Sequence, residues 1–383
     1  MDSKKVIAAA NLTDDLVVEI LSRVPFKSFC RFKCVCKAWL AFASDPHYHR
    51  KLPKIPTGLF HGGNDGSVAE LASMSPNDEE INGALTFLPH HEHLEFVDCC
   101  NGLVLCKYKT SYASAEACRF IMCNPATREW RSLPVPDTQP DPTEFVGDTF
   151  LAFDPSWSAQ FYVFNFQEKF DGYWTLGINK LEVFSSDLST WIVDAAWSPF
   201  IKICNPHHFI GGVLYVHTNG GDILGLEVIG SGIPPRHFIV KLPHGHSDLV
   251  SGCFGQSSGF LQCALPEESG HTIAVFSLDT CHSYKWSFKY RLSMGNAFGR
   301  DDFLHIDDEG WYRWLDYQIV ALDSERKVLF LVDKVRMKLL SYDIITGKLS
   351  EIEDGCRTDY LYYVACYSKL PVLSSFEHTQ ETC

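Results

Sequence analysis

The chain has 383 residues, of which 46% are hydrophobic and 21% charged, and its formal net charge is −14. This length predicts two domains, or one small module followed by a large domain, and the ordinary globular composition excludes a disordered or fibrous protein. No apolar run reaches the roughly 18–20 residues that a membrane-spanning helix needs.

The charge is divided unevenly along the chain. Residues 1–54 contain ten Lys and Arg against five Asp and Glu, so the remaining residues hold 23 against 42. A large acidic domain repels the phosphates of nucleic acids and of anionic membranes, which argues against both as its ligands. The basic N-terminal region suits an acidic partner.

The 15 cysteines are scattered and show no regular spacing. Several lie within apolar strand-like segments, among them Cys106, Cys123 and Cys263. We therefore expect free thiols in a reducing compartment rather than disulfides. The charged Asp14 and Asp15 follow a short N-terminal stretch without an adequate apolar run, which argues against a signal peptide. A cytoplasmic or nuclear location is expected.

The first predicted element is a helix over residues 13–24. Its apolar residues recur at three- and four-residue steps, as they do on one face of a helix. These residues are Leu16, Val17, Ile20, Leu21 and Val24. Thr13 is placed as the N-cap, where its hydroxyl would accept from the first free N–H groups. Pro25 ends the helix.

A second helix is predicted over residues 27–43, before Ser44-Asp-Pro46 stops it. Its apolar residues are Phe29, Phe32, Val35, Cys36, Trp39 and Leu40. A helical unit this small cannot bury much of its own surface. Its apolar face therefore predicts a protein partner.

From about residue 57 the pattern changes to short β-branched and aromatic segments bounded by Gly, Pro, Asn or Asp. One strand–turn–strand pattern recurs clearly at 120–134, 181–193, 273–286 and 338–350, and more weakly at 225–243 and before 89. Apolar segments of inner-strand character lie between the copies, at 102–106, 161–166, 212–216, 259–263 and 328–332.

The spacing of these copies is close to the roughly 40–50 residues of one propeller blade of four strands. The sequence therefore predicts a mainly β protein, with a small helical module followed by a β-propeller of about six blades. The last strand, residues 360–366, is expected to close the ring against the strand that starts it, which removes exposed edges.

The N-terminal run resembles an F-box. Leu12, the segment Asp15-Leu-Val-Val-Glu-Ile-Leu21, the Val24-Pro25 break and Phe32-Lys-Cys-Val-Cys-Lys-Ala-Trp39 carry this resemblance. The rest is similar to the F-box-associated domains of plant F-box proteins, through Cys100-Asn-Gly-Leu-Val-Leu105, Asn124-Pro-Ala-Thr-Arg-Glu-Trp-Arg-Ser-Leu-Pro134, Phe153-Asp-Pro155 and Tyr362-Tyr-Val-Ala-Cys-Tyr-Ser-Lys-Leu370. The expected domains are an F-box module at 1–54, the propeller at 55–373 and a tail at 374–383.

This resemblance implies that the module docks on the Skp-type adaptor of a ubiquitin ligase and, through it, on cullin and RING subunits. The positions expected to contact the adaptor are Leu12, Leu16, Ile20, Leu21, Val24, Pro25, Val35 and Trp39. An F-box usually begins with Leu-Pro, and here Thr13 replaces the proline. The substitution removes apolar contact area, so a reduced affinity for the adaptor is expected.

Two short patterns have a plain structural interpretation that outweighs a catalytic or metal-binding one. Gly255-Gln-Ser-Ser-Gly259 matches the G-x-S-x-G pattern of serine hydrolases, but that motif needs a strand leading into a helix, and an apolar strand follows here. The histidine groups, such as His90, His91 and His93, lack a second cluster at the spacing of a zinc site. We expect no metal and no cofactor.

Acidic and aromatic residues gather at 301–317, where Asp307-Asp-Glu309 precedes Trp311, Tyr312 and Trp314. Exposed Trp and Tyr side chains make binding anchors, so these three are the candidate substrate-binding residues. The competing interpretation, ordinary strand and core aromatics, carries slightly more weight. A glycosidase with paired carboxylates is a further alternative, because propellers also host such enzymes.

The leading hypothesis is a non-catalytic, substrate-recognition subunit of an SCF-type (Skp–cullin–F-box) ubiquitin ligase, with an unknown protein target. The alternatives are a propeller hydrolase acting on a sugar or an ester, for which Ser257 would be tested, and an interaction scaffold that binds the adaptor without ubiquitination. The sequence does not name the target, because propellers bind through loops.

Overall fold

The structure is a computed structural model that describes residues 13–24, 28–29, 31, 57–62, 69–73, 81–109, 120–135, 144–170, 175–194, 201–230, 232–243, 252–280, 284–307, 313–354, 357 and 359–370. The chain divides into two compact units, Met1–Thr57 and Gly58–Cys383. The domain boundaries expected from the sequence, after residues 54 and 373, remain predictions.

Helix α1 (Asp14–Ser22) is the main described element of the first unit. Thr13 is its N-cap, with an extended backbone at φ −67° and ψ 154°, but the Thr13 side chain makes no capping hydrogen bond. The expected hydroxyl cap is therefore wrong. The helix begins instead with the backbone bond from the Val17 N–H to the Thr13 carbonyl, at 3.0 Å.

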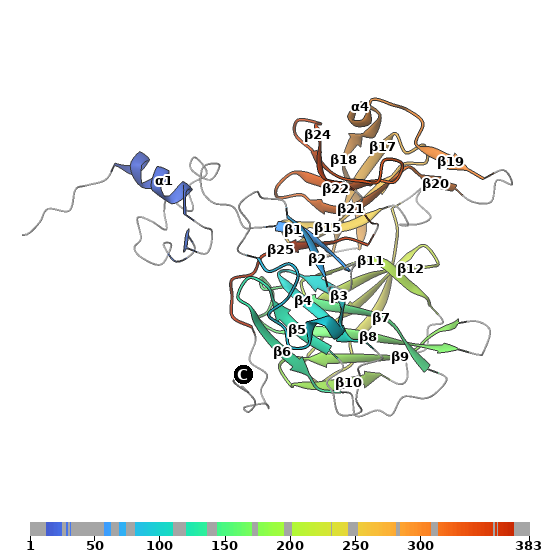
Figure 1. Ribbon diagram of the computed structural model, residues 1–383. Helices are drawn as coiled ribbons and strands as arrows, with labels where there is room; N and C mark the ends of the chain where they lie inside the picture. Colours follow the sequence, from blue (N-terminus) through green and yellow to red (C-terminus); the bar gives the residue numbers. More distant parts are fainter. Residues whose placement is uncertain are drawn as a thin grey trace, which may run out of the picture. The chain divides into compact units, whose positions relative to one another are not determined.

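The second unit consists of antiparallel sheets whose strands follow one another along the chain (Figure 1). The first four-stranded sheet contains β3 (Leu94–Cys100), β4 (Leu103–Tyr108), β5 (Phe120–Asn124) and β6 (Glu129–Leu133). The second contains β7 (Glu144–Phe153), β8 (Phe161–Phe170), β9 (Thr175–Ser185) and β10 (Thr190–Asp194). The third contains β11 (Ile203–Ile210), β12 (Val213–Thr218), β13 (Asp222–Glu227) and β14 (Arg236–Lys241).

Two further groups of four strands share one eight-stranded sheet, because β15 and β21 pair in parallel. One group is β15 (Cys253–Ser257), β16 (Phe260–Pro266), β17 (Thr272–Asp279) and β18 (Lys285–Ser293). The other is β21 (Tyr317–Asp323), β22 (Val328–Asp333), β23 (Lys338–Asp343) and β24 (Leu349–Asp354). Between the groups lie helix α4 (Met294–Phe298) and a hairpin of β19 (Leu304–Ile306) and β20 (Arg313–Leu315).

A three-stranded sheet joins the two ends of the propeller sequence. Its order is β2 (Glu70–Ser73), β1 (Thr57–His61) and β25 (Leu361–Val364). The 3-10 turn η1 (His91–His93) precedes β3. The last strand therefore lies beside the first, as the sequence predicts, and this pairing closes the ring.

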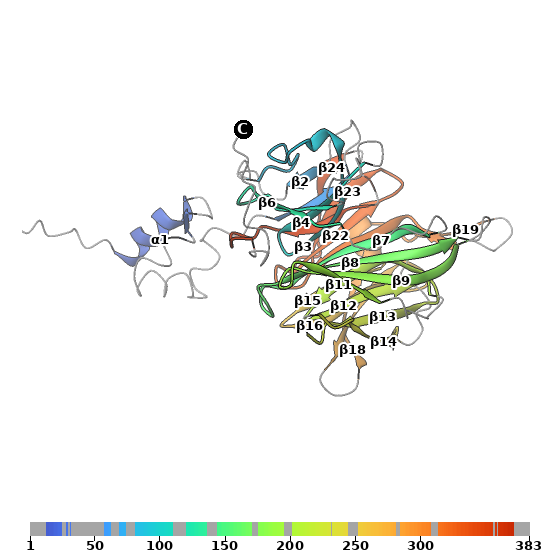
Figure 2. The same cartoon turned by 90° about the horizontal axis from the view of Figure 1, so that it is seen from below.

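We number the six blades from the sheet that closes the ring: β1, β2 and β25 form the first blade, β3–β6 the second, β7–β10 the third, β11–β14 the fourth, β15–β18 the fifth and β21–β24 the sixth. Their innermost strands form a closed ring. β25 contacts β3, β3 contacts β7, β7 contacts β11, and β11 contacts β15; β15 pairs with β21, and β21 contacts β25. Figure 2 shows the neighbouring sheets β7–β10 and β11–β14 from a second direction. An innermost strand followed by three successively outer strands is the organisation of a β-propeller blade.

The predicted fold class, mainly β with a propeller, is confirmed. Within the described residues the structure has four separate sheets of four or more strands, against the six blades expected. The difference arises because two four-stranded groups share the eight-stranded sheet, and because the sheet that closes the ring has three described strands.

The recurring hairpins predicted from the sequence are the third and fourth strands of the blades, at β5–β6, β9–β10, β13–β14, β17–β18 and β23–β24. The copy expected before residue 89 is wrong, because residues 81–90 lie in turns. The segments assigned inner-strand character are the second strands, β4, β8, β12, β16 and β22. The innermost strands carry buried polar side chains, which interrupt the apolar pattern.

The two ends of the ring follow from the topology. In an antiparallel blade the connections after the second and fourth strands emerge at the same end, which carries α4, the β19–β20 hairpin and the turn 334–337; we call it the rim end. β1 finishes at this end, because the Arg357 guanidinium donates to the Gly62 carbonyl, and the rings of His61 and Tyr360 lie 5.0 Å apart. Thr57 therefore lies at the opposite end, which we call the tether end.

Short turns at the tether end tie each blade to the next. The Asn101 amide donates to the Phe153 carbonyl at 2.6 Å, and the Gly211 N–H donates to the Asp154 carboxylate at 2.9 Å. Gly102 has φ +89°, and a Cβ there would lie 2.5 Å from the Cys366 backbone nitrogen. This turn therefore requires glycine, both for its conformation and for its close approach to the chain that follows β25.

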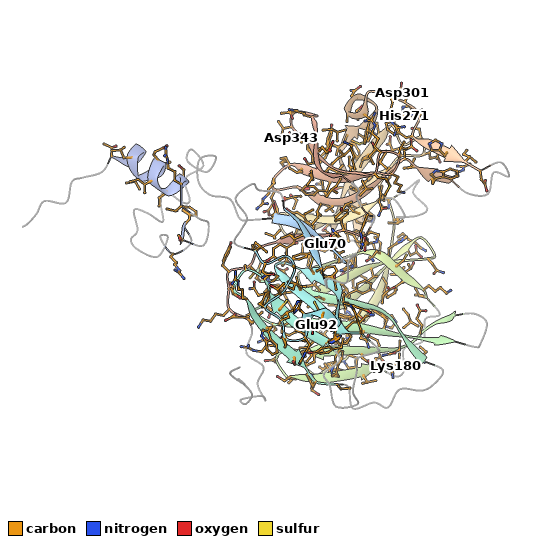
Figure 3. The ribbon with its side chains drawn as sticks, viewed as in Figure 1. Glu70, Glu92, Lys180, His271, Asp301 and Asp343 are labelled. Atoms are coloured by element: carbon orange, nitrogen blue, oxygen red, sulfur yellow. The ribbon has the colours of Figure 1, made fainter. Side chains whose placement is uncertain are left out.

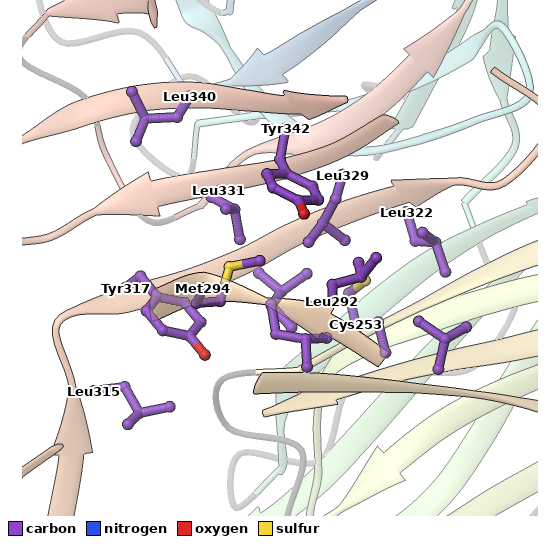
Figure 4. Close-up of a cluster of buried hydrophobic side chains, with 14 of the residues drawn as sticks. Cys253, Leu292, Met294, Leu315, Tyr317, Leu322, Leu329, Leu331, Leu340 and Tyr342 are labelled. Carbon is purple, nitrogen blue, oxygen red and sulfur yellow. The ribbon is translucent and has the colours of Figure 1, made fainter. Parts of the chain in front are cut away.

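Hydrophobic cores fill the spaces between neighbouring blades. The largest cluster joins β15–β18 to β21–β24 and includes Met294 of α4 (Figure 4). Tyr317 lies fully buried in it, and its hydroxyl donates to the Gly270 carbonyl at 2.8 Å. Burial raises the pKa of the Tyr317 hydroxyl, so this hydrogen bond is kept in the neutral form over the physiological range.

The described cysteines are free thiols, as the sequence predicts. Most are buried, and burial raises the pKa of the Cys99, Cys106 and Cys123 thiols. A buried neutral thiol packs as a small apolar group. These cysteines therefore belong to the blade cores.

Candidate functional site

Helix α1 is apolar on both its buried and its exposed faces. Val17, Val18 and Leu21 are buried, whereas Leu16 and Ile20 keep 51% and 50% of their surface exposed. Leu16 and Ile20 are four residues apart, so their side chains are neighbours on the helix surface. This pair provides an accessible apolar contact on α1.

The remaining predicted adaptor-contact residues divide into two sets. Leu21 is only 1% exposed and Val24 is partly buried, so both pack within the unit. Four others lie outside the described residues: Leu12, Pro25, Val35 and Trp39. The contacts expected for all of these positions remain predictions.

The β19–β20 hairpin at the rim end presents aromatic and apolar side chains. The rings of His305 and Trp314 stack at 5.6 Å with an interplanar angle of 21°. Trp314 is 48% exposed, and Ile306 on the same hairpin is 50% exposed. Trp314 is thus an exposed aromatic, as a binding anchor requires. Trp311 and Tyr312 lie outside the described residues.

A buried carboxylate fixes the base of this hairpin. Asp316 is 5% exposed; its Oδ2 accepts from Arg300 at 2.6 Å, and its Oδ1 lies 2.5 Å from His305 Nε2. Desolvation opposes the charge of Arg300, but the hydrogen bond and charge of Asp316 outweigh it, so the Arg300 pKa is raised. The Arg300 guanidinium also lies 4.9 Å from the centre of the Phe303 ring. These contacts hold His305 beneath Trp314.

A neighbouring turn exposes two further apolar side chains. Residues 334–337 connect β22 to β23, and the Lys334 N–H bonds the Asp316 carbonyl at 2.7 Å. Val335 and Met337 on this turn are 64% and 49% exposed. We call the four exposed residues Ile306, Trp314, Val335 and Met337 the rim surface. A groove lined by Phe298, Arg336, Leu349 and Glu351 runs beside it.

Figure 3 marks the same end of the fifth blade through His271 and Asp301, which lie close together. His271 Nδ1 and Asp301 Oδ1 are 3.6 Å apart; the Asp301 side chain is largely exposed and that of His271 is partly exposed. The predicted acidic cluster therefore includes a solvated carboxylate, Asp301, while the neighbouring Asp316 is buried and paired with Arg300 and His305. Asp316 is the residue that sequence reasoning missed.

Buried polar groups also connect the innermost strands. Asp98 on β3 is 1% exposed, and its carboxylate accepts from the Leu151 N–H of β7 at 2.7 Å. His207 Nε2 on β11 lies 3.0 Å from the same oxygen. This one carboxylate therefore links three consecutive blades, and its contacts have a structural role.

His208, the next residue on β11, faces β15. Its Nε2 lies 3.3 Å from Gln256 Oε1. Burial lowers the pKa of His208 to about 4, and the hydrogen bond to Gln256 and the charge of Asp154 only partly oppose this shift. His208 is therefore neutral in the folded protein at physiological pH.

The hydrolase-like pattern at 255–259 is a turn between strands, as expected. Ser257 ends β15 and pairs with Phe260 at the start of β16. Ser258 and Gly259 form the turn with φ +52° and +79°. An antiparallel hairpin does not provide the strand-to-helix elbow that exposes a catalytic serine.

The described residues contain no group of three or more His, Cys, Asp or Glu side chains arranged to hold a metal ion. No helix among them is long and apolar enough to span a membrane.

Residues 10–51 match the model of the F-box domain. The F-box protein At5g07610 of Arabidopsis thaliana is 24% identical over 73% of this chain and 70% of its own length. The putative F-box/kelch-repeat protein At1g15680 of the same plant is 22% identical over 96% of this chain and 90% of its own length. The F-box protein At5g49610, also from this plant, is 32% identical, over 35% of each chain.

Among solved structures, a chain in the nidogen/laminin complex is 12% identical, with a TM-score of 0.42, over 82% of this chain and 99% of its own. This similarity says nothing about function. The predicted resemblance, to plant F-box proteins with a propeller-like domain, is confirmed by the F-box match, the Arabidopsis relatives and the fold. An F-box implies binding to Skp-type adaptors and supports an SCF substrate-adaptor role in general.

Proposed function

We propose that this F-box protein is the substrate-recognition subunit of an SCF-type ubiquitin ligase. The F-box would dock on the Skp-type adaptor, and the propeller would hold a target protein. The observation that carries the proposal is the F-box match at residues 10–51, followed by a closed propeller. The free, buried thiols support a reducing location, in the cytoplasm or the nucleus.

The docking contact is proposed to include Leu16 and Ile20. Full burial of one such side chain contributes about 1.5–3 kcal/mol, and half of each is already buried in the free protein. Together the pair would contribute on the order of 2 kcal/mol to adaptor binding. Leu21 would support the contact indirectly, by holding α1 against the rest of its unit.

The target is proposed to bind at the rim surface. Exposed apolar side chains that include an aromatic anchor are typical of protein-binding sites. Transfer of ubiquitin to the target would then depend on the proximity that the ligase supplies. The protein itself would contribute no catalytic residue.

The docking proposal is tested by binding of the purified full-length chain to a purified Skp-type adaptor. Leu16→Glu with Ile20→Glu is expected to weaken binding at least about tenfold, because two charges must then be desolvated. The matched control is Ile229→Glu with Ile233→Glu on the propeller, where the exposed fractions are 52% and 51%. Equal binding by both double variants and the unchanged protein would contradict the proposal.

The target proposal is tested by affinity capture from plant extract with the proteasome inhibited. Proteins that the unchanged chain retains, and a Trp314→Ala, Ile306→Ser variant loses, are candidate targets. Each is then offered to the reconstituted ligase. Ubiquitination that needs both the docking pair and the rim surface supports the proposal; retention without ubiquitination would indicate a scaffold. Turnover of a sugar or ester substrate by the chain alone would indicate the hydrolase alternative.

A further inference from the structure

The outer strands of the fourth and fifth blades, β14 and β18, meet over a cluster of aromatic side chains. The rings of Phe238 and Tyr284 lie 5.0 Å apart, and Trp286 Nε1 donates to the Lys241 carbonyl at 2.8 Å. Phe238 and Trp286 also pack against the same hydrophobic core. The two outer strands therefore form one continuous surface, which we call the β14–β18 surface.

An irregularity in β18 leaves aromatic area exposed on this surface. Phe288 pairs with Phe276 and Tyr290 with Val275, so Lys289 is an extra residue in the ladder. Such a bulge reverses the alternation of side chains. Tyr290 consequently packs against the core shared with β21–β24, while Phe288 remains 49% exposed, with the Arg291 guanidinium 4.8 Å from its ring centre. Tyr284 is 41% exposed.

The surface is basic although the chain as a whole is acidic. β14 and β18 together contain five Lys and Arg and no Asp or Glu. Three of these cations pair with carboxylates on neighbouring segments: Arg236 with Glu227, Lys241 with Asp222, and Arg291 with Glu267. Lys285 and Lys289 are exposed and have no ion-pair partner among the described residues. Asp279 lies opposite Lys285 in the ladder, so the five cations have four carboxylates beside them. The surface therefore keeps a small excess of positive charge in a chain of net charge −14.

β18 is also an open sheet edge. In the described part of the chain its one strand neighbour is β17, so its outer N–H and C=O groups face away from the blade. Lysines on an edge strand deter unselective pairing, and they favour an acidic strand over a basic one. Edge protection alone does not account for two half-exposed aromatic rings beside these lysines. An extended peptide that adds a strand uses both backbone bonds and side-chain pockets.

We propose that the β14–β18 surface binds an extended acidic segment of a target protein by strand addition to β18. Lys285 and Lys289 would pair with its carboxylates, and Tyr284 and Phe288 would contact an apolar side chain between them. The inference rests on the proposed function only in assigning the segment to a target. It places a second contact on the side of the propeller, separate from the rim surface.

The probe is a fluorescein-labelled synthetic peptide with the length of β18, 9 residues, in which Glu alternates with Val around a central Phe. Its binding to the full-length chain is measured by fluorescence anisotropy. Saturable binding with Kd below about 1 mM is expected. The same peptide with Lys for Glu is expected to bind at least about tenfold more weakly. No saturation, or equal binding of both peptides, would overturn the proposal.

Two protein variants separate this surface from general charge attraction. Lys285→Glu with Lys289→Glu is expected to weaken binding at least about tenfold. The control, Lys327→Glu with Lys348→Glu, makes the same charge change at exposed lysines of the sixth blade and is expected to leave affinity within about twofold. Equal losses from both pairs would show unspecific attraction and overturn the site.

Changes to the peptide test strand addition without altering the protein. N-methyl groups at alternate positions block one edge of an extended peptide and spare the other. One alternating set is expected to reduce binding at least about tenfold, and the other set to reduce it less than about threefold. Equal effects would exclude strand addition. Adaptor binding and target capture by the unchanged chain do not depend on these results, so this inference and the proposed function fail separately.

Discussion

The connections between strands differ at the two ends of the propeller. At the tether end, two-residue turns such as Asn101–Gly102 bond directly to the next blade, and one glycine fits against the chain that follows β25. At the rim end, the connection from the fifth to the sixth blade carries α4 and a hairpin, with Trp314 and Ile306 half exposed. The tight turns hold the ring closed. Exposed apolar residues occur at both ends, such as Phe260 and Ile345 at tether-end turns, but the long rim-end connection also presents the exposed ring of Trp314.

The comparison predicts that substitutions toward the tether end change stability, whereas those at the rim end change binding. The largest effect is expected for Asp98→Ala, because it leaves the Leu151 N–H and His207 without their carboxylate partner. A loss of about 3–5 kcal/mol in the free energy of unfolding is expected, measured by urea denaturation. The rim-end control Asp301→Ala, at a side chain 84% exposed, is expected to change it by less than about 0.5 kcal/mol. Similar losses of unfolding free energy in both variants would refute the expected difference between the tether end and the rim end.

The next largest effect concerns the glycines of the tether-end turns. Gly102→Ala is expected to lower the free energy of unfolding by about 3–4 kcal/mol, because it adds a backbone clash to the strain of a positive φ. Gly259 has φ +79°, and a Cβ there has no atom within 4 Å. Gly259→Ala should therefore cost only the strain, about 1–2 kcal/mol. Thermal unfolding of both variants measures the difference, and equal costs would mean that Gly102 is not in close contact after β25.

A smaller effect is expected from acid. Because the folded-state pKa of His208 is about 4 against an ordinary 6.5, the unfolded chain binds more protons between these values. The His208 contribution to stability is therefore complete above pH 6.5 and falls as the pH approaches 4, by about 2 kcal/mol at pH 4.5. His208→Phe should reduce the slope of unfolding free energy against pH in this window. An unchanged slope would show that His208 does not titrate there.

The smallest effect on stability is expected at the rim surface. Trp314→Ala removes a half-exposed ring and should change the free energy of unfolding by less than about 0.5 kcal/mol, while target capture is lost. Arg300→Ala should act differently, because it also removes a partner of the buried Asp316. Urea denaturation alongside the capture assay separates the two roles; a large loss of stability in Trp314→Ala would place this ring in the fold instead.

The outer hairpins of the blades were predictable because their turn chemistry is local. Asn124 Oδ1 accepts from the Ala126 N–H, and Asp343 Oδ1 accepts from the Ile345 and Thr346 N–H groups, so each turn is stabilised within a few residues of chain. Alternating side chains on both sides then identify the strands. These features need no knowledge of the rest of the fold.

The innermost strands were not predictable in the same way. Asp98 and His207 are 109 residues apart in sequence and interrupt apolar stretches, yet they meet across three blades. Asp316 is similar: Arg300 and His305 pair with it only once the hairpin has folded. A sequence pattern predicts that a charged side chain is exposed. It misses a buried one whose partners come from distant segments.

The pairing of β25 with β1 also has a consequence for synthesis. Leu361 follows His61 by 300 residues. At a synthesis rate of roughly 5–20 residues per second, β25 can pair with β1 only about 15–60 s after β1 is made. During that time the F-box is complete, while the propeller still has an unpaired edge. A chain that stops before β25 therefore carries a complete F-box and a propeller whose ring is still open.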